Sequence, residues 1–262
     1  MQKVRLFGLP ILNTSKKEFF ATLQDSLLVD QAKATLSIFT PNPEQVVLTK
    51  QDPAFAKNLQ QADYLLADGI GLVWASRLLK LFGRLPAALT ERLAGVEVVE
   101  YLLDLAQQHE LKALVIGGRD YKGSYQGESF EDQSSLLKIG PNLYWTEAYQ
   151  EKNEILPVEE QALAAIIKKL QPSLVFVALG APDQEKWIVE HLQLLQSNRV
   201  RTAMAVGGSF DFILAKVPRA PQLVQKIGLE WLYRLIKQPW RYRRQLRLLA
   251  FIKLTWREIL AT

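Results

Sequence analysis

The sequence contains no cysteine and only two histidines, His109 and His191, among its 262 residues. Without cysteine there can be no disulfide framework, thiolate nucleophile or cysteine-ligated zinc ion. The two histidines lie far apart in the sequence, and neither has a metal-ligand partner at helical spacing. We therefore expect no metal site, and we expect both histidines to have packing roles.

Long uncharged runs are also missing. The longest stretch without a charged residue runs only from Leu170 to Pro182 and contains two prolines, whereas a membrane-spanning helix needs about 18 or more apolar residues. The first residues, MQKVRLFGLP, lack the apolar run and small-residue cleavage site of a signal peptide. We therefore expect a cytoplasmic protein.

The net charge of +5 is distributed unevenly along the chain. Residues 216–262 hold eleven Lys and Arg but two acidic residues, whereas the preceding 215 residues hold 21 basic and 25 acidic residues. This contrast predicts an α/β domain over 1–215 and a basic amphipathic appendage over 216–262.

Short apolar runs rich in β-formers alternate with amphipathic segments throughout the first 215 residues. This alternation predicts an α/β fold of the Rossmann-like kind, with a mostly parallel sheet and helices on both faces. The expected strands are Val4–Phe7, Leu36–Phe39, Tyr64–Leu66, Ala113–Ile116, Leu143–Trp145, Leu174–Ala178 and Thr202–Val206.

Helices are expected between these strands. Residues 15–18 form a capping box, Asp183 is placed to cap a helix that ends at Leu195, and Trp74 and Trp187 are expected in the core. Further helices are predicted over Ile70–Leu79, Val96–His109 and Val158–Leu170. The polar segment from Arg119 to Pro141 is predicted to be irregular.

Polar and glycine-rich turns follow four of the predicted strands. These turns are Thr40–Gln45, Ala67–Gly71, Leu179–Glu185 and Gly207–Asp211. Ligands bind outside the carboxyl ends of strands in an open parallel sheet. The four turns follow the carboxyl ends of their strands and are expected to lie at the same edge of the sheet, which predicts a binding site there. Taken singly, each turn has a structural alternative, since Gly and Pro turn the chain and Asp caps helices.

A fifth glycine turn, Gly117–Gly118, offers backbone amides to a phosphate group. Neither a GxGxxG nor a GxxxxGK[ST] pattern is present, which argues against a nicotinamide oxidoreductase and a P-loop enzyme. Asp68 stands out because partial desolvation would suit its carboxylate to accept a proton from an alcohol. The alternative is that Asp68 caps the helix beginning at Ile70.

The basic appendage has three interpretations. Amphipathic segments surround Trp240–Arg244, and a stripe of apolar residues runs from Leu248 to Leu260 through Leu249, Ile252, Trp256 and Ile259. Such a segment fits an anionic membrane surface, a solvated face packed on its own domain, or a nucleic-acid-binding arm.

The ordered set of motifs closely resembles that of the WecG/TagA/CpsF glycosyltransferases. The matching segments are Thr40–Glu44, Ala67–Gly71, Gly180–Trp187, Gly207–Phe212, Arg219–Pro221 and Gly228–Arg234. The resemblance covers the chain from about Thr40 to Arg234. The residues Arg92–Glu97 depart from the RxxGxD pattern by one conservative change, and Arg119–Gln150 lacks the usual helix and HGYF-like turn.

This resemblance implies an inverting, metal-independent transfer of N-acetylmannosamine or a related sugar from a UDP-sugar to a polyprenyl-diphosphate-linked saccharide at the inner membrane face. It implies Asp68 as base, with Thr40, Asn42 and Gln184 in the same pocket. Neither a cofactor nor a nucleic-acid partner is implied, and self-association stays open. The implied donor-binding residues are Gly117, Gly118, Gly180, Gly207, Gly208 and Asp211, and the acceptor diphosphate is assigned to Arg219, Arg234 and Arg241.

One rival function remains open at this point. A non-catalytic sugar-nucleotide or nucleic-acid binding module would share the glycine turns and the polyanion-binding tail. Steep salt dependence of DNA binding would favour that rival, whereas release of UDP in the presence of a lipid acceptor would favour the enzyme.

Overall fold

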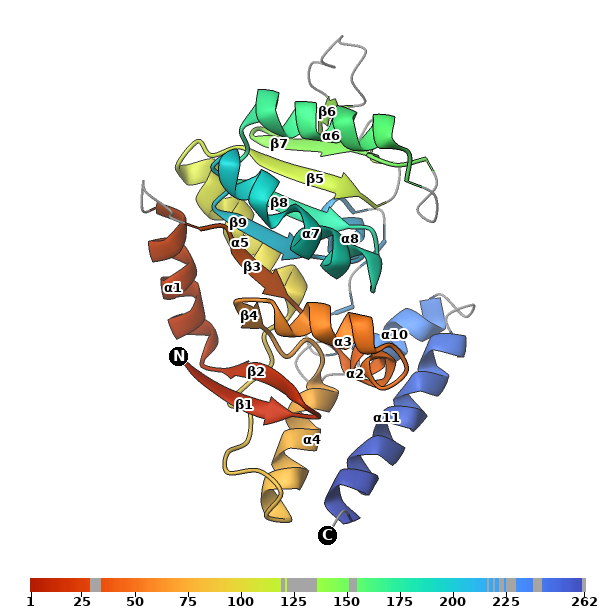
Figure 1. The fold of residues 1–262 in the computed structure, drawn as a ribbon. Coiled ribbons are helices and arrows are strands. Elements are labelled where there is room, and N and C mark those ends of the chain that lie inside the picture. The colour runs from red at the N-terminus through yellow and green to blue at the C-terminus, as the bar shows by residue number, and fades with distance from the viewer. Residues whose placement is uncertain are drawn as a thin grey trace. The chain divides into compact units, whose positions relative to one another are not determined.

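The computed structural model describes an α/β chain that forms two compact units (Figure 1). The first unit comprises Met1–Glu18, Thr40–Ala94 and Val217–Thr262, and the second comprises Phe19–Phe39 and Gly95–Lys216. The described residues are 1–28, 34–118, 121, 136–150, 155–215, 217–218, 220–221, 224, 230–237 and 242–260. The second unit ends at Lys216, next to the domain boundary predicted at residues 215/216. The C-terminal segment from Val217 does not form a unit of its own, because it belongs to the first unit together with Met1–Glu18 and Thr40–Ala94.

The second unit is built on a mostly parallel sheet. Its strands are β3 (Leu36–Phe39), β5 (Ala113–Gly117), β6 (Leu136–Lys138), β7 (Leu143–Thr146), β8 (Leu174–Ala178) and β9 (Thr202–Ala205). They run in the order β3-β9-β8-β5-β7-β6, and only the β6–β7 pairing is antiparallel. Every residue of β5 and β8 is buried, as expected for strands covered on both faces.

Helices cover both faces of this sheet. They are α1 (Lys16–Leu28), whose first turn belongs to the first unit, α5 (Gly95–Gln108), α6 (Pro157–Leu170), α7 (Asp183–Ser197) and α8 (Ser209–Ile213). In Figure 1, α7 lies in front of β8 and β9, and α5 lies behind the sheet. The mostly parallel α/β fold predicted from the sequence is therefore confirmed.

The first unit combines a β-hairpin with helices. Strands β1 (Gln2–Leu6) and β2 (Leu9–Asn13) pair antiparallel, and β2 pairs parallel with β4 (Tyr64–Leu65). The hairpin turns at Phe7 and Gly8, which both have positive φ (52° and 88°), as a two-residue hairpin turn of this kind requires. The helices are α2 (Pro43–Thr49), α3 (Pro53–Gln60), α4 (Ile70–Leu81), α10 (Glu230–Lys237) and α11 (Tyr242–Leu260).

Most expected elements are present, and the differences are local. The capping box is confirmed, because Ser15 Oγ accepts from the Glu18 N–H while Glu18 Oε2 accepts from the Ser15 N–H. The strands β2 and β6 were not predicted. The expectation of an irregular segment over 119–141 is wrong over residues 136–138, which form β6, whereas residues 139–141 are irregular as expected. Residues 119–120 and 122–135 of this segment lie outside the described ranges.

Two further expectations need correction. Asp183 is the first residue of α7 rather than its cap, because Pro182 holds the cap position. Trp187 is buried as expected, but Trp74 is 60% exposed. The sequence gives α4 apolar residues on every side, so its pattern does not indicate which face is covered.

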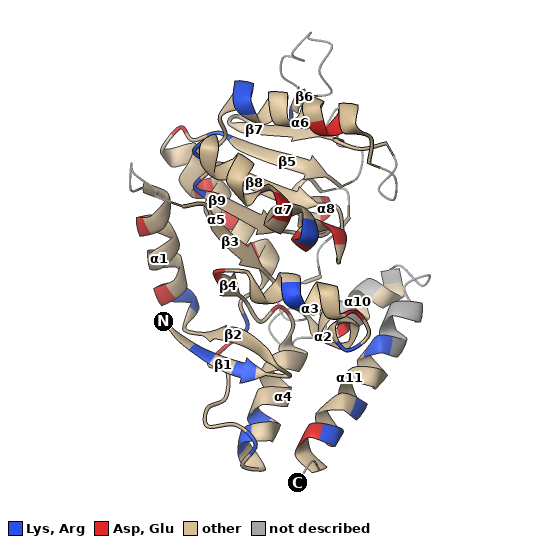
Figure 2. Cartoon of the chain, viewed as in Figure 1, with Lys and Arg blue, Asp and Glu red and all other residues tan. Residues whose placement is uncertain are grey.

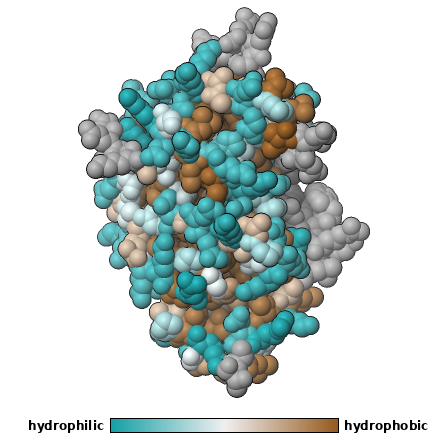
Figure 3. Space-filling view, in the orientation of Figure 1, coloured by the Kyte–Doolittle hydropathy of each residue, from teal (hydrophilic) through white to brown (hydrophobic). Residues whose placement is uncertain are grey.

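Charged and apolar side chains are mixed on the surface. Figure 2 shows Lys and Arg on α4 and α11, and Figure 3 shows apolar atoms exposed beside hydrophilic ones. Within the described ranges, no helix is both long and apolar enough to cross a bilayer.

Candidate functional site

The candidate residues belong to two groups, one in each unit. In the first unit, the turn after β3 begins α2. Asn42 caps this helix: its Oδ1 accepts from the Gln45 N–H at 3.0 Å, and Gln45 Oε1 accepts from the Asn42 N–H at 3.1 Å. Pro43 occupies the first turn, where its missing N–H leaves no hydrogen bond unmade. Asn42 therefore fixes the shape of this turn, and the half-buried Thr40 lies just before it.

The turn that carries Asp68 packs on this first turn. The Asp68 N–H donates to the Pro41 carbonyl oxygen at 3.0 Å. A Cβ atom on Gly69 would lie 3.2 Å from Pro43 Cδ, and one on Gly71 would lie 2.9 Å from Pro43 Cγ. Glycine at these positions therefore allows the two turns to approach closely.

Asp68 does not cap α4. The cap residue is Gly69, whose φ of 107° favours glycine, and α4 begins at Ile70. The alternative of a capping role for Asp68 is therefore rejected, and its side chain is half-buried after the end of β4. The Leu93 N–H donates to the Ala67 carbonyl at 3.1 Å, which brings the Arg92–Ala94 segment beside the same turn.

In the second unit, Gln184 joins the turns that follow β8 and β9. Its Oε1 accepts from the Gly180 N–H at 3.2 Å and from the Gly207 N–H at 3.0 Å. Its Nε2 donates to Glu185 Oε1 at 2.8 Å, and only 4% of the residue is exposed. Gln184 thus fixes the relative position of the two glycine turns.

The Gly117–Gly118 turn after β5 is fixed by aromatic side chains. Trp145 Nε1 donates to the Gly117 carbonyl at 2.8 Å. Both glycines have positive φ (75° and 95°), and a Cβ on Gly118 would lie 2.8 Å from the Tyr121 hydroxyl oxygen. The sequence indicated a turn with backbone amides for a phosphate group, and the structure adds that the turn is tightly packed against Trp145 and Tyr121.

Tyr121 links this turn to the Gly207–Asp211 turn. Its hydroxyl donates to Asp211 Oδ1 at 3.1 Å, and its ring lies edge-on to Trp145 with centroids 5.7 Å apart. Both Tyr121 and Asp211 are buried. Sequence reasoning found Asp211 but missed Tyr121, because a lone tyrosine in a polar stretch shows no periodicity.

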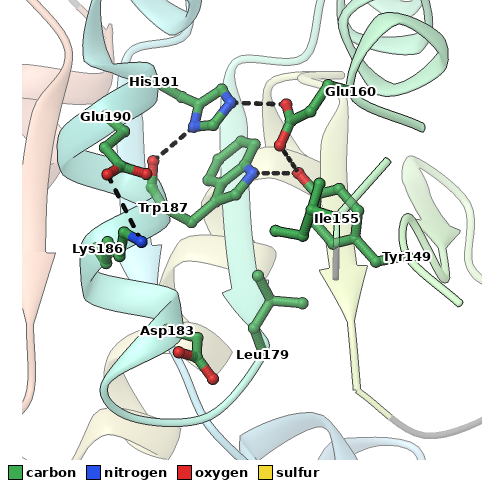
Figure 4. Close-up of a pocket in the computed structure, with 9 residues that line it drawn as sticks. All are labelled: Tyr149, Ile155, Glu160, Leu179, Asp183, Lys186, Trp187, Glu190 and His191. Carbon is green, nitrogen blue, oxygen red and sulfur yellow. Dashed lines mark hydrogen bonds and ion pairs between the residues drawn. The ribbon is translucent and has the colours of Figure 1, made fainter. Parts of the chain in front are cut away.

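A small pocket of about 80 Å³ lies beside α7 in the same unit (Figure 4). Trp187 Nε1 donates to the Tyr149 hydroxyl, which donates to Glu160 Oε1 at 2.8 Å. Burial, foremost, and the hydrogen bond with Glu160 raise the pKa of Tyr149 well above its ordinary value, so this hydroxyl stays protonated and remains a donor.

His191 completes the network around this pocket. Its Nε2 lies 2.9 Å from Glu160 Oε2, its Nδ1 lies 2.8 Å from the Trp187 carbonyl oxygen, and its ring stacks on Trp187 with centroids 4.2 Å apart. These contacts give His191 the packing role expected from the sequence. They hold the segment after β7, which contains Tyr149, against α6 and α7.

One of the three proposed acceptor-binding arginines lies among the described residues. Arg219 and Arg241 lie outside the described residues, and Arg234 lies within α10. In the part of the chain that is described, no group of three His, Asp or Glu side chains is arranged to hold a metal ion.

The candidate residues of the two units suit different chemical roles. The first unit presents a half-buried carboxylate after β4. In the second unit, the parallel strands β5, β8 and β9 end in glycine turns at one edge of the sheet, the position where α/β folds bind nucleotides. Proton transfer suits the first arrangement, and recognition of an anionic donor suits the second.

Comparison with known sequences covers both units. The model of the glycosyl transferase WecG/TagA/CpsF family matches residues 4–262. A Staphylococcus aureus protein (strain MRSA252) named N-acetylglucosaminyldiphosphoundecaprenol N-acetyl-beta-D-mannosaminyltransferase is 28% identical over 232 residues, which cover 88% of this chain and 84% of that protein. A protein of the same name from strain NCTC 8325 / PS 47 is 29% identical over 233 residues, with the same coverage.

Proposed function

Because this chain belongs to the WecG/TagA/CpsF family of glycosyltransferases, we propose that it transfers N-acetylmannosamine from a UDP-sugar to a polyprenyl-diphosphate-linked N-acetylglucosamine. The names of the two S. aureus relatives support this acceptor and this sugar. The reaction belongs to the assembly of a cell-surface polysaccharide.

The proposed reaction is a single displacement with inversion. A hydroxyl oxygen of the acceptor sugar forms a bond to the anomeric carbon of the donor, and the bond from that carbon to the UDP oxygen breaks. Asp68 accepts the proton of the attacking hydroxyl, and UDP leaves with the bonding electrons. The observation that carries this assignment is the half-buried position of Asp68, three residues after the end of β4, where its N–H donates to the Pro41 carbonyl oxygen of the neighbouring turn.

The remaining candidates are assigned to the donor and to the leaving group. Thr40 and Asn42 lie in the turn that packs against the Asp68 turn, which supports their assignment to the same pocket. The backbone of the Gly117–Gly118 and Gly207–Gly208 turns, together with Gly180 and Asp211, is assigned to the UDP moiety, with Gln184 holding two of these turns in place. The N–H groups of Gly180 and Gly207 already donate to Gln184. Other backbone N–H groups of these turns can stabilise the departing diphosphate without a metal ion.

A polyprenyl acceptor stays in the bilayer, so the enzyme must work at the inner membrane surface. The basic C-terminal segment, with eleven Lys and Arg against two acidic residues, supports peripheral binding to anionic lipid. Arg219, Arg234 and Arg241 remain the proposed partners of the acceptor diphosphate, because the planar guanidinium group matches phosphate oxygens.

The test is a transfer assay that follows UDP release from UDP-N-acetylmannosamine with a short-chain polyprenyl-diphosphate N-acetylglucosamine acceptor. We expect release to require the acceptor and to persist in EDTA, and the product linkage to be inverted relative to the donor. Donor binding without transfer to any such acceptor would favour the non-catalytic module instead. A thermal-shift series of UDP-, GDP- and dTDP-sugars identifies the donor nucleotide independently, because bound ligand stabilises the native state.

A further inference from the structure

Helix α4 exposes a stripe of large apolar side chains. Trp74, Leu78, Leu81 and Phe82 recur at helical spacing along α4 and its final turn, and Leu81 is 78% exposed. The opposite side of α4 is buried through Leu72, Val73, Ala75 and Leu79. A stripe of this size is unusual on a soluble surface and indicates a partner.

Helix α11 carries one buried stripe and one exposed apolar stripe rather than the single apolar stripe expected from the sequence. Phe251, Thr255 and Ile259 are buried within the first unit. The second stripe is exposed and contains Leu249, Ile252, Trp256 and Leu260, with Leu260 at 74% exposure. Only one stripe is therefore needed to attach α11 to its own unit.

The two exposed stripes belong to neighbouring helices of the same unit. Arg84 Nε, just after α4, donates to the Ile259 carbonyl in the last turn of α11 at 3.0 Å. At the other end, a Cβ on Gly71 would lie 3.8 Å from Phe251 Cε1. Figure 1 shows α4 and α11 running side by side. We call their exposed residues the α4–α11 surface.

Basic side chains accompany these stripes. Arg77, Lys80 and Arg84 are exposed along and after α4, and Arg247, Lys253 and Arg257 are exposed on α11. Figure 2 shows Lys and Arg on both helices. Helix α4 contains no acidic residue, and α11 contains only Glu258. Tryptophan and large aliphatic side chains flanked by Lys and Arg are typical of helices that lie in the interface of an anionic membrane.

We propose that the α4–α11 surface docks the enzyme on anionic lipid, with α4 inserting its apolar stripe together with α11. This proposal rests on the proposed function, which requires the enzyme to work at a membrane. It extends the membrane-binding surface to α4, which lies outside the basic C-terminal segment. It also links docking to the site through the chain itself, since α4 begins two residues after Asp68.

A second copy of the chain is a less suitable occupant of this surface. A two-fold contact would bring two copies of this basic surface together, and their like charges would repel each other. Lysine is also depleted at protein interfaces, whereas an anionic lipid surface complements these charges.

The first experiment measures sedimentation with phosphatidylglycerol/phosphatidylcholine vesicles that contain no acceptor lipid. Replacing Trp74, Leu81 and Phe82 together by serine should weaken binding about tenfold or more, because three inserted side chains are lost. The matched control replaces Leu156 and Val158 by serine; both are exposed apolar residues in the second unit, so binding should be unchanged. Equal binding by the triple variant and the wild type would overturn the proposal.

A second measurement locates α4 directly and distinguishes this proposal from the proposed function. The Trp74→Phe variant keeps the apolar character, so it should still bind vesicles but lose part of the fluorescence quenching by brominated lipid; unchanged quenching would refute insertion of α4. The triple variant should retain transfer to a detergent-free, water-soluble acceptor analogue.

Two outcomes separate this proposal from the alternatives. If wild-type protein binds vesicles yet transfers nothing, the proposed function fails while the docking surface stands. A concentration-dependent dimer that the triple variant abolishes, without vesicle binding by the wild type, would assign the surface to self-association and refute docking.

Discussion

Replacement of Gly118 by alanine should destabilise the protein through two separable effects. Gly118 has a φ of 95°, and an L-residue in this region costs about 1–2 kcal/mol. The added Cβ would lie 2.8 Å from the Tyr121 hydroxyl oxygen and 3.0 Å from its Cε2. Overpacking in a well-filled core costs about 1–3 kcal/mol, so the expected total loss in the free energy of unfolding is about 2–5 kcal/mol.

The steric part of this loss depends on the rigidity of Tyr121. Its ring is fully buried, lies edge-on to Trp145 and donates to Asp211 through its hydroxyl. The ring therefore has little freedom to move away from a new methyl group. Gly117 is a weaker probe, because its Cβ would meet the end of the flexible Leu179 side chain.

Gly180→Ala is the matched control in the same unit. Gly180 also has a positive φ, 86°, but no atom lies within 4 Å of a Cβ built there. Its replacement should lower the free energy of unfolding by only about 1–2 kcal/mol, the cost of placing an L-residue at a positive φ. Urea unfolding followed by circular dichroism gives both values. If Gly118→Ala costs no more than Gly180→Ala, the tight packing of Tyr121 against the glycine turn is refuted.

Three further variants test other contacts. Gln184→Leu should lower the free energy of unfolding by about 1–3 kcal/mol, because the part-buried N–H groups of Gly180 and Gly207 lose their shared acceptor. A loss below about 0.5 kcal/mol would contradict this role. Phe251→Ala should cost about 3–5 kcal/mol in urea unfolding, since this buried ring contacts Phe7, and a loss no larger than that of exposed Ile252→Ala would contradict its anchoring role. The backbone N–H groups of Gln150 and Leu156 donate to Glu159 and lower its pKa from 4.5. The ionised carboxylate therefore contributes to folding stability above pH 4.5, and this contribution is lost as the pH falls through the lowered pKa. Glu159→Gln should flatten the acid limb of the curve of stability against pH, and an unchanged limb would contradict this role.

The sequence was sufficient for elements with a clear period or a clear cap. The β8 strand matches its predicted bounds, and α1 begins at the capping box, because both depend on short-range patterns. Strand β2 was missed because Pro10 interrupts its pattern and the turn before it, Phe7–Gly8, has only two residues. Strand β6 is short and only partly buried, so its propensity signal is weak.

For the candidate site too, the sequence predicted the positions of residues but not their long-range contacts. Residues just after strands could be found because chain order and the parallel-sheet rule place them at one edge. The roles of Gln184 and Tyr121 could not, since they depend on contacts between turns that are distant in sequence. Trp74 was misjudged for a similar reason: α4 is apolar on all sides, and only the packing of its neighbours decides which side is covered.

The most direct test of the central claim compares transfer by Asp68→Asn and Asp63→Asn. Both changes remove one carboxylate from the first unit, but Asp63 is exposed and lies before β4. Loss of a general base lowers the rate by about 10²–10⁴-fold, so Asp68→Asn should lose at least about 100-fold in kcat with an unchanged melting temperature, whereas Asp63→Asn should match the wild type. Retention of more than half of the wild-type kcat by a folded Asp68→Asn protein would contradict the assignment of Asp68 as the base.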